Sequence, residues 1–117
     1  MTNTDKRILF LRKLATLIDQ ASLKDIDFIV TSFHRTAEEQ NELFEEGKSK
    51  ADGYEKKSKQ QDWLAVDIVI IEDGNPIWKR TDKYNLIGNL WEENGGTWGG
   101  SWKSFPDIFH FELGEQK

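Results

Sequence analysis

The sequence predicts a small α+β domain, in which a small antiparallel sheet is flanked by helices. Three observations support this class. Apolar residues recur at helical spacing near the N-terminus and again before Gly95, short β-branched runs have the composition of strands, and glycine turns divide the C-terminal segment. The 117 residues suffice to bury a core, and no repeat or linker divides them, so we expect one domain spanning residues 1–117.

The chain is expected to begin with a helix followed by a strand. Apolar residues between Ile8 and Ile18 recur at helical spacing, which predicts a helix over roughly residues 4–21. The stretch DFIVTS, residues 27–32, is short, apolar and rich in β-branched residues. This composition is typical of a strand.

A second helix and a long polar loop are expected next. Thr36 followed by Glu39 has the capping-box pattern, which predicts the start of a helix that ends at Gly47. Residues 48–62 are polar and lysine-rich and show no periodicity, so they are expected to form a loop. Loops of this length in compact domains are commonly functional or disordered.

The second half is expected to contain a central strand and a third helix. Residues 63–71 form the longest apolar run, and the turn EDGN separates them from a short strand at residues 76–78. A helix is predicted from about Asp82 to Asn94, with its end at Gly95. The remainder mixes glycine turns with short β segments. We expect Trp78, Trp91, Trp98 and Trp102 to fill the core of this half.

Composition excludes several classes of function. The chain has no cysteine, so a metal site must use oxygen and imidazole ligands. A net charge of -5 disfavours nucleic-acid binding, and no apolar run is long enough to enter a membrane as a spanning helix. Charged residues interrupt the first apolar patch, as in an amphipathic helix and unlike a signal peptide. We therefore expect a protein that is cytoplasmic as synthesised. We also expect a monomer, since no long apolar stripe is left over.

One carboxylate and one histidine stand out as candidate site residues. Asp67 interrupts the apolar run WLAVDIVI, where a carboxylate is costly to bury unless a positive group meets it. If residues 108–113 form a strand, His110 shares a face with Glu112. Two paired strands could bring Asp67 and His110 to one zinc ion, with Asp107 as the base for water. The residues also allow a half-buried, hydrogen-bonded His110 and an Asp67 that pairs with a lysine or arginine.

Several separated stretches resemble one family. TSFHRTAEEQNELFEEGKSKADGY, KKSKQQDWLAVDIVI and WEENGGTWGGSWKSFPDIFHFE occur in the order found in zinc peptidases that include D-alanyl-D-alanine carboxypeptidases and L-alanyl-D-glutamate endopeptidases of phage endolysins. The resemblance covers residues from about 28 to 113. It implies the fold that these peptidases share with the Hedgehog signalling domain, and a zinc-dependent hydrolysis of peptidoglycan peptides.

The resemblance also implies a metal site. In the family signature Ser-x-His-x-x-Gly-x-Ala-x-Asp, the histidine and the aspartate bind zinc, and a later histidine follows an acidic general base by three residues. Asp67 and His110 match two zinc ligands, and Asp107 matches the base. Gln60 stands where the first histidine is expected. An amide offers only a neutral carbonyl oxygen, which suits harder ions better than zinc, so we expect weakened zinc binding.

Three further positions are implied to contact substrate. Arg35 matches the arginine of a Ser-x-x-Arg block and is expected to face the cleft, where it would bind a substrate carboxylate or steady an oxyanion. Ser58 matches the first residue of the signature, and Trp63 replaces its glycine and is expected to shape the cleft wall. His34 is expected to point away from the cleft and to serve local packing.

The sequence leaves the role of Gln60 and the function open between alternatives. Gln60 is a natural loss, an engineered substitution, or a weaker ligand in a working enzyme. The first functional hypothesis is a hydrolase of the peptidoglycan stem peptide, which as a phage lysin would act on the cell wall after release. The alternative is a non-catalytic cell-wall-binding or structural module that keeps the peptidase fold.

Overall fold

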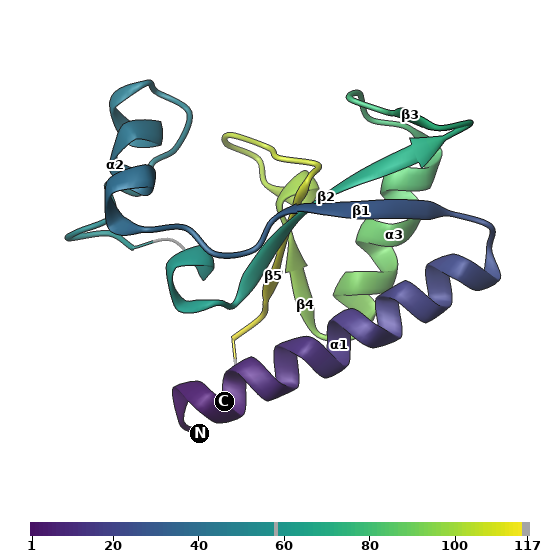
Figure 1. Cartoon of the computed structure of the whole chain (residues 1–117), viewed down its shortest axis with the longest axis horizontal. Coiled ribbons are helices and arrows are strands. Elements are labelled where there is room, and N and C mark those ends of the chain that lie inside the picture. The colour runs from purple at the N-terminus through teal and green to yellow at the C-terminus, as the bar shows by residue number, and fades with distance from the viewer. Residues whose placement is uncertain (58, 116–117) are drawn as a thin grey trace.

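The computed structural model describes residues 1–57 and 59–115 and has the expected α+β architecture (Figure 1). The three helices cover the expected regions, and the capping box expected at Thr36 is formed. A second capping box, between Thr2 and Asp5, starts the first helix. In chain order the elements are α1 (Asn3–Leu23), β1 (Asp27–Ser32), α2 (Ala37–Glu45), the 3-10 turn η1 (Lys59–Asp62), β2 (Ala65–Glu72), β3 (Asn75–Pro76), α3 (Asp82–Glu93), β4 (Gly96–Trp98), the 3-10 turn η2 (Gly99–Ser101) and β5 (His110–Leu113).

The strands form one antiparallel sheet in the order β1-β2-β5-β4, and the short β3 pairs with the end of β2. The central strand β2 therefore receives β1 on one side and β5 on the other. Strand β5 comes from the far end of the sequence, so the topology brings residues about forty positions apart into direct register. This pairing positions the candidate site.

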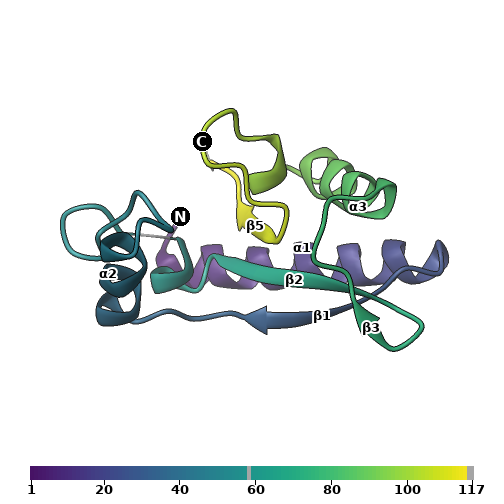
Figure 2. The same ribbon diagram turned by 90° about the horizontal axis from the view of Figure 1, so that it is seen from above.

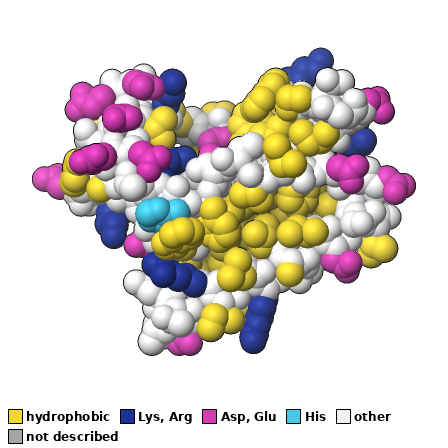
Figure 3. Space-filling view, viewed as in Figure 1, with side chains coloured by type: hydrophobic (Ala, Val, Ile, Leu, Met, Phe, Trp, Pro, Cys, Tyr) yellow, Lys and Arg dark blue, Asp and Glu magenta, His cyan; other side chains and the backbone are white. Residues whose placement is uncertain are grey.

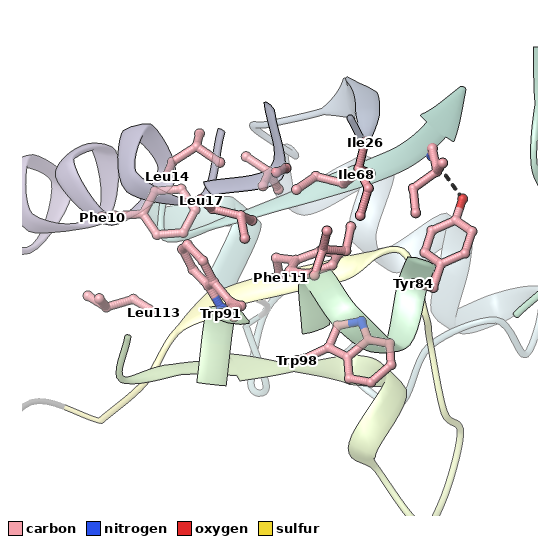
Figure 4. Packing of buried hydrophobic residues seen from close by; sticks show 14 of the residues in the cluster. Phe10, Leu14, Leu17, Ile26, Ile68, Tyr84, Trp91, Trp98, Phe111 and Leu113 are labelled. Atoms are coloured by element: carbon pink, nitrogen blue, oxygen red, sulfur yellow. Dashed lines mark hydrogen bonds between the residues drawn. The ribbon is translucent and has the colours of Figure 1, made fainter. Parts of the chain in front are cut away.

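The core lies between the sheet and the helices α1 and α3. In Figure 4, Phe10, Leu14 and Leu17 of α1 point toward Trp91 and Phe111. These side chains are buried, and Trp91 donates a hydrogen bond from Nε1 to the Glu112 carbonyl at 2.8 Å. Figure 2 shows α1 lying along the sheet, with α3 beside β5. The helices thus hold β5 from one face.

The expected strand over residues 63–71 begins two residues later than predicted. Trp63 has a backbone φ of +63°, in the left-handed region, which is incompatible with an extended strand. The Leu64 N–H bonds instead to the Lys59 carbonyl at 2.9 Å and closes the turn η1. Strand β2 therefore starts at Ala65.

Two of the four C-terminal tryptophans do not fill the core as predicted. Trp91 and Trp98 are buried, and Gly88 leaves room for the Trp98 indole, which a Cβ on this glycine would meet at 2.2 Å. Trp78 is 66% exposed and Trp102 is 37% exposed, because both lie in connecting segments outside the sheet and helices. Aromatic composition alone did not distinguish these two pairs.

The outer surface carries further apolar residues. Hydrophobic side chains gather across the middle of the face that carries α1 and β1 (Figure 3). Ile29 and Val30 of the edge strand β1 are exposed on the surface, as is Ile18 of α1. Within the described residues, no helix combines the length and the hydrophobicity needed to cross a bilayer.

Tyr84→Phe is expected to lower the free energy of unfolding by about 1–2 kcal/mol, because the buried hydroxyl makes two hydrogen bonds. It accepts from the Ile70 N–H at 3.0 Å and donates to the Ile77 carbonyl at 2.5 Å, which ties α3 to β2 and to the segment after β3. Urea unfolding of both proteins measures the difference. An unchanged midpoint would show that these bonds add no net stability.

Candidate metal and catalytic site

Asp67 and His110 face one another across two paired strands. They are direct partners in the antiparallel pairing of β2 with β5. The distance from Asp67 Oδ1 to His110 Nδ1 is 3.8 Å, too long for a hydrogen bond. Oδ1 is buried and has no hydrogen-bond partner among the described residues. The pair therefore presents two donor atoms to a shared space.

Asp107 joins this pair from the turn that precedes β5. Its N–H bonds to the Gly99 carbonyl at 2.9 Å, and its Oδ1 accepts from the Phe109 N–H at 3.0 Å, so both ends of the residue are fixed. One ligand atom from each of Asp67, Asp107 and His110 lies within 4.8 Å of the other two. The arrangement is compact enough for one cation to contact more than one of these groups.

Glu112 fixes the orientation of the histidine. The distance from His110 Nε2 to Glu112 Oε1 is 2.8 Å, so the alternation expected for residues 110 and 112 is present. A carboxylate accepts only, so Nε2 carries the proton, and in a neutral imidazole Nδ1 then keeps its lone pair toward Asp67. This carboxylate–histidine arrangement orients many metal-binding histidines in proteins.

Arg35 is the positive group beside Asp67. It lies between β1 and α2, with NH2 at 3.5 Å from Asp67 Oδ2 and NH1 donating to Gln40 Oε1 at 2.8 Å. Gln40 is fully buried and also donates to Ser49 Oγ and the Ala51 carbonyl, each at 2.8 Å. Sequence analysis missed Gln40, because a polar residue in a short helix is usually exposed. Its burial depends on the loop that folds back over α2.

The alternative to a metal site, in which Asp67 pairs with a basic residue and His110 is hydrogen-bonded, is also partly present. Asp67 pairs with Arg35, and His110 contacts Glu112. These contacts use Asp67 Oδ2 and His110 Nε2 only. Asp67 Oδ1 and His110 Nδ1 are the atoms that face each other. The ion pair and the imidazole contact therefore leave one donor atom of each residue for a ligand.

Gln60 lies in η1 and is fully buried. Its Nε2 contacts Ser32 Oγ at 3.0 Å and the Ser32 carbonyl at 3.5 Å. Its backbone carbonyl accepts from the Arg35 N–H at 3.2 Å, which joins the two segments that carry these residues. Ser58, which the resemblance implied to contact substrate, lies outside the described residues.

Trp63 and His34 pack together at the surface. Their rings are stacked with centroids 4.3 Å apart and an interplanar angle of 17°. This contact gives His34 the local packing role expected from its position beside Arg35. A different aromatic ring approaches the cluster itself, since the Trp102 and His110 centroids are 5.0 Å apart. Sequence analysis assigned Trp102 to the core and so missed its position next to His110.

Burial raises the pKa of Asp67 above its ordinary value of 3.8, and the nearby Asp107 carboxylate raises it further. The imidazole of His110, the guanidinium of Arg35 and the polar side chain of Gln60 act in the opposite direction on the pKa of Asp67. The positive and polar neighbours therefore do not fully offset the cost of burying an ionised carboxylate beside Asp107.

A raised pKa for Asp67 has a definite consequence for stability. Above pH 3.8 the unfolded chain releases this proton before the folded protein does, so the Asp67 contribution falls as pH rises from 3.8 through the raised folded pKa. Asp67→Asn is therefore expected to gain stability relative to the native protein as pH increases. Urea unfolding in chelator, between about pH 4 and pH 8, gives the difference. Parallel stability curves for the two proteins would contradict it.

The left-handed backbone at Trp63 predicts an unusual ranking of substitutions. Trp63→Gly is expected to be more stable than Trp63→Ala by about 1 kcal/mol, because alanine keeps the cost of positive φ and glycine does not. Both variants lose the stacking on His34, so their difference isolates the backbone effect. Thermal or urea unfolding of the two variants makes the comparison, and equal stabilities would show that the backbone relaxes.

Comparisons with known proteins identify the family of the chain. The family profile for D-alanyl-D-alanine carboxypeptidase matches residues 53–113, which include Asp67, Asp107 and His110. The chain is 34% identical over 109 residues to the peptidoglycan L-alanyl-D-glutamate endopeptidase CwlK of Bacillus subtilis (strain 168), and this match covers 80% of the chain. It covers 64% of CwlK, so the chain spans less than two thirds of the length of that relative.

Two solved structures share the fold. The Serratia marcescens L-Ala D-Glu endopeptidase ChiX superposes with a TM-score of 0.64 at 28% identity, covering 75% of this chain and 67% of ChiX. The vancomycin resistance D,D-pentapeptidase VanY, solved in complex with Zn(II), gives a TM-score of 0.62 at 22% identity over 89% of this chain and 70% of VanY. From the profile match over more than half of its length, the chain belongs to the D-alanyl-D-alanine carboxypeptidase family of peptidases.

Proposed function

We propose that the protein is a metal-dependent hydrolase of the peptidoglycan stem peptide that cleaves an amide next to a D-amino acid. The observation that carries the proposal is the cluster of Asp67, Asp107 and His110 within 4.8 Å, in a chain of this family. The relatives named for L-alanyl-D-glutamate cleavage support peptidoglycan as the substrate class. A peptidoglycan peptide is accordingly the proposed partner.

The residues of the cluster fit a divalent cation. Three carboxylates, Asp67, Asp107 and Glu112, lie in or beside it, and Arg35 is the guanidinium that pairs with Asp67. The buried Oδ1 of Asp67 has no hydrogen-bond partner in the described part of the chain. Excess negative charge and an unpaired buried oxygen are the features that a cation would compensate. Zinc is the ion that the family and the VanY complex suggest.

Each residue has a proposed role. Asp67 and His110 hold the cation, with Gln60 at the third position, and Glu112 keeps the imidazole in the tautomer whose Nδ1 is free. When bound, the cation supplies Lewis acidity to the scissile carbonyl. Asp107 accepts a proton from the attacking water and delivers it to the leaving amine.

Arg35 is proposed to recognise the negative end of the substrate. Its guanidinium is partly exposed and is oriented by Gln40, and a guanidinium can bind a carboxylate through two parallel hydrogen bonds. Trp63 is proposed to contact the substrate on the basis of its place in the family signature, and so is Ser58, which lies outside the described residues. Trp102, whose ring lies next to the His110 ring, is proposed as a further residue that contacts the substrate.

Two synthetic peptides test the proposal. One contains an L-Ala–D-Glu bond and the other ends in D-Ala-D-Ala, and each is incubated with the protein in the presence of zinc or manganese. Mass spectrometry of the products identifies the bond that is cleaved. Cleavage of either peptide supports the hydrolase. Binding to purified sacculi with no cleavage, by both the native protein and a Gln60→His variant, would favour a non-catalytic module.

A further inference from the structure

We propose that the site takes a divalent cation that prefers oxygen ligands, represented by Mn²⁺, and that Gln60 binds it through its side-chain carbonyl oxygen. This inference rests on the proposed function only in using the same site. Metal binding is measured without substrate, so a failure of hydrolysis and a failure of metal binding are separate results.

The hydrogen bonds of Gln60 indicate which end of its amide is available. Nε2 contacts both Ser32 Oγ and the Ser32 carbonyl, at 3.0 and 3.5 Å. A backbone carbonyl can only accept, so the amide nitrogen faces Ser32 and Oε1 is the remaining atom. Oε1 is buried and has no hydrogen-bond partner among the residues that the structure describes. A buried acceptor without a donor costs free energy that a cation would recover.

A second unpaired oxygen lies beside this amide. Ser32, which contacts the Gln60 amide, is the strand partner of Asp67 in the pairing of β1 with β2, and Asp67 Oδ1 is the other buried carboxylate or amide oxygen that lacks a partner in the described chain. His110 Nδ1 is 3.8 Å from this same Oδ1. Asp67, Asp107 and His110 thus each offer one ligand atom within 4.8 Å of the others, and the Gln60 amide is held next to Asp67 through Ser32.

The chemistry of this donor set points away from a nitrogen-rich zinc site. Catalytic zinc sites commonly use two or three imidazoles, whereas here one imidazole is combined with carboxylate and amide oxygens. Carboxylate, carbonyl and water ligands suit Mg²⁺, Ca²⁺ and Mn²⁺. Mn²⁺ also accepts an imidazole, so it fits the single histidine better than the other two ions.

Selectivity must be measured as a ratio, because zinc binds a given nitrogen and oxygen site more tightly than manganese. Bound metal is first removed from the purified protein with chelator. The protein is then titrated with Mn²⁺, and the concentration of free Mn²⁺ is measured from its electron paramagnetic resonance signal. A separate titration with Zn²⁺ is followed by calorimetry. The same titrations are made on Gln60→His. We expect the zinc-to-manganese affinity ratio to be at least about tenfold lower for the native protein than for Gln60→His.

Two further variants separate ligation from folding. Gln60→Met keeps the length of the side chain and removes its oxygen, and it is expected to lower Mn²⁺ affinity about tenfold or more. Gln61→Ala is the matched control, because this neighbouring amide donates to the Gly53 carbonyl. Its Mn²⁺ affinity should equal that of the native protein. Circular dichroism confirms that each variant is folded.

Three results would overturn the inference. The first is no Mn²⁺ binding by the native protein at millimolar concentration. The second is an equal zinc-to-manganese ratio for the native protein and Gln60→His, and the third is unchanged Mn²⁺ affinity in a folded Gln60→Met variant. Mn²⁺ binding that is lost in Gln60→Met and retained in Gln61→Ala supports it.

Discussion

Asp107→Asn is expected to lower kcat for peptide cleavage by about 10²–10⁴-fold, the usual contribution of a positioned general base. Asparagine keeps an oxygen that can accept from the Phe109 N–H, so the turn before β5 is retained. It cannot take up the proton of the attacking water. The substitution therefore removes proton transfer while leaving the local backbone in place, and steady-state kinetics at saturating metal measures the loss.

The matched control for this variant is Asp52→Asn. The Asp52 carboxylate also accepts from backbone groups, at 3.0 Å from the Tyr54 N–H and 2.9 Å from the Lys56 N–H, but it lies in the loop after α2 and outside the cluster. The Asp52→Asn variant should therefore cleave the peptide at the native rate. If Asp107→Asn, fully loaded with metal, also cleaves at the native rate, another group is the base.

The geometry of the site depends on which strands pair and in which register. The sequence predicted the strands and the face on which their side chains lie, but not the pairing itself. Alternation in DIFHFE correctly placed His110 and Glu112 on one face, because residue spacing in a strand fixes the side of the sheet. The apolar run around Asp67 correctly identified a central strand. Their direct pairing also required β5 to lie next to β2, and the resemblance to a known fold supplied this long-range information.

Other features could not be predicted because they depend on contacts between distant segments. Gln40 is buried because the loop after α2 folds over it and provides acceptors at Ser49 and Ala51. Trp63 adopts a left-handed backbone that its residue type does not favour, and the glycine of the family signature was the available signal. Trp102 contacts the His110 ring, whereas its glycine-rich surroundings had been interpreted as core turns.

Gly99→Ala is expected to lower the free energy of unfolding by about 3 kcal/mol and to weaken metal binding at least tenfold. The reason is that the added methyl group would overlap with atoms of Asp107 and His110. An alanine Cβ at this position would lie 2.5 Å from the Asp107 carbonyl oxygen and 3.0 Å from His110 Cβ. The Gly99 carbonyl also accepts the Asp107 N–H at 2.9 Å. Relief of the contact must therefore displace the turn that carries both Asp107 and His110.

Gly74→Ala separates this effect from the general cost of replacing a glycine. Gly74 has φ +79° and an added Cβ meets no atom within 4 Å, so alanine costs about 1 kcal/mol of backbone strain and leaves the cluster untouched. Urea unfolding and metal titration of both variants give the two quantities. Loss of stability in Gly99→Ala with native metal affinity would show that the cluster tolerates movement of its turn. A joint loss, absent from Gly74→Ala, would show that the close approach of Gly99 to Asp107 and His110 keeps these side chains in register with Asp67.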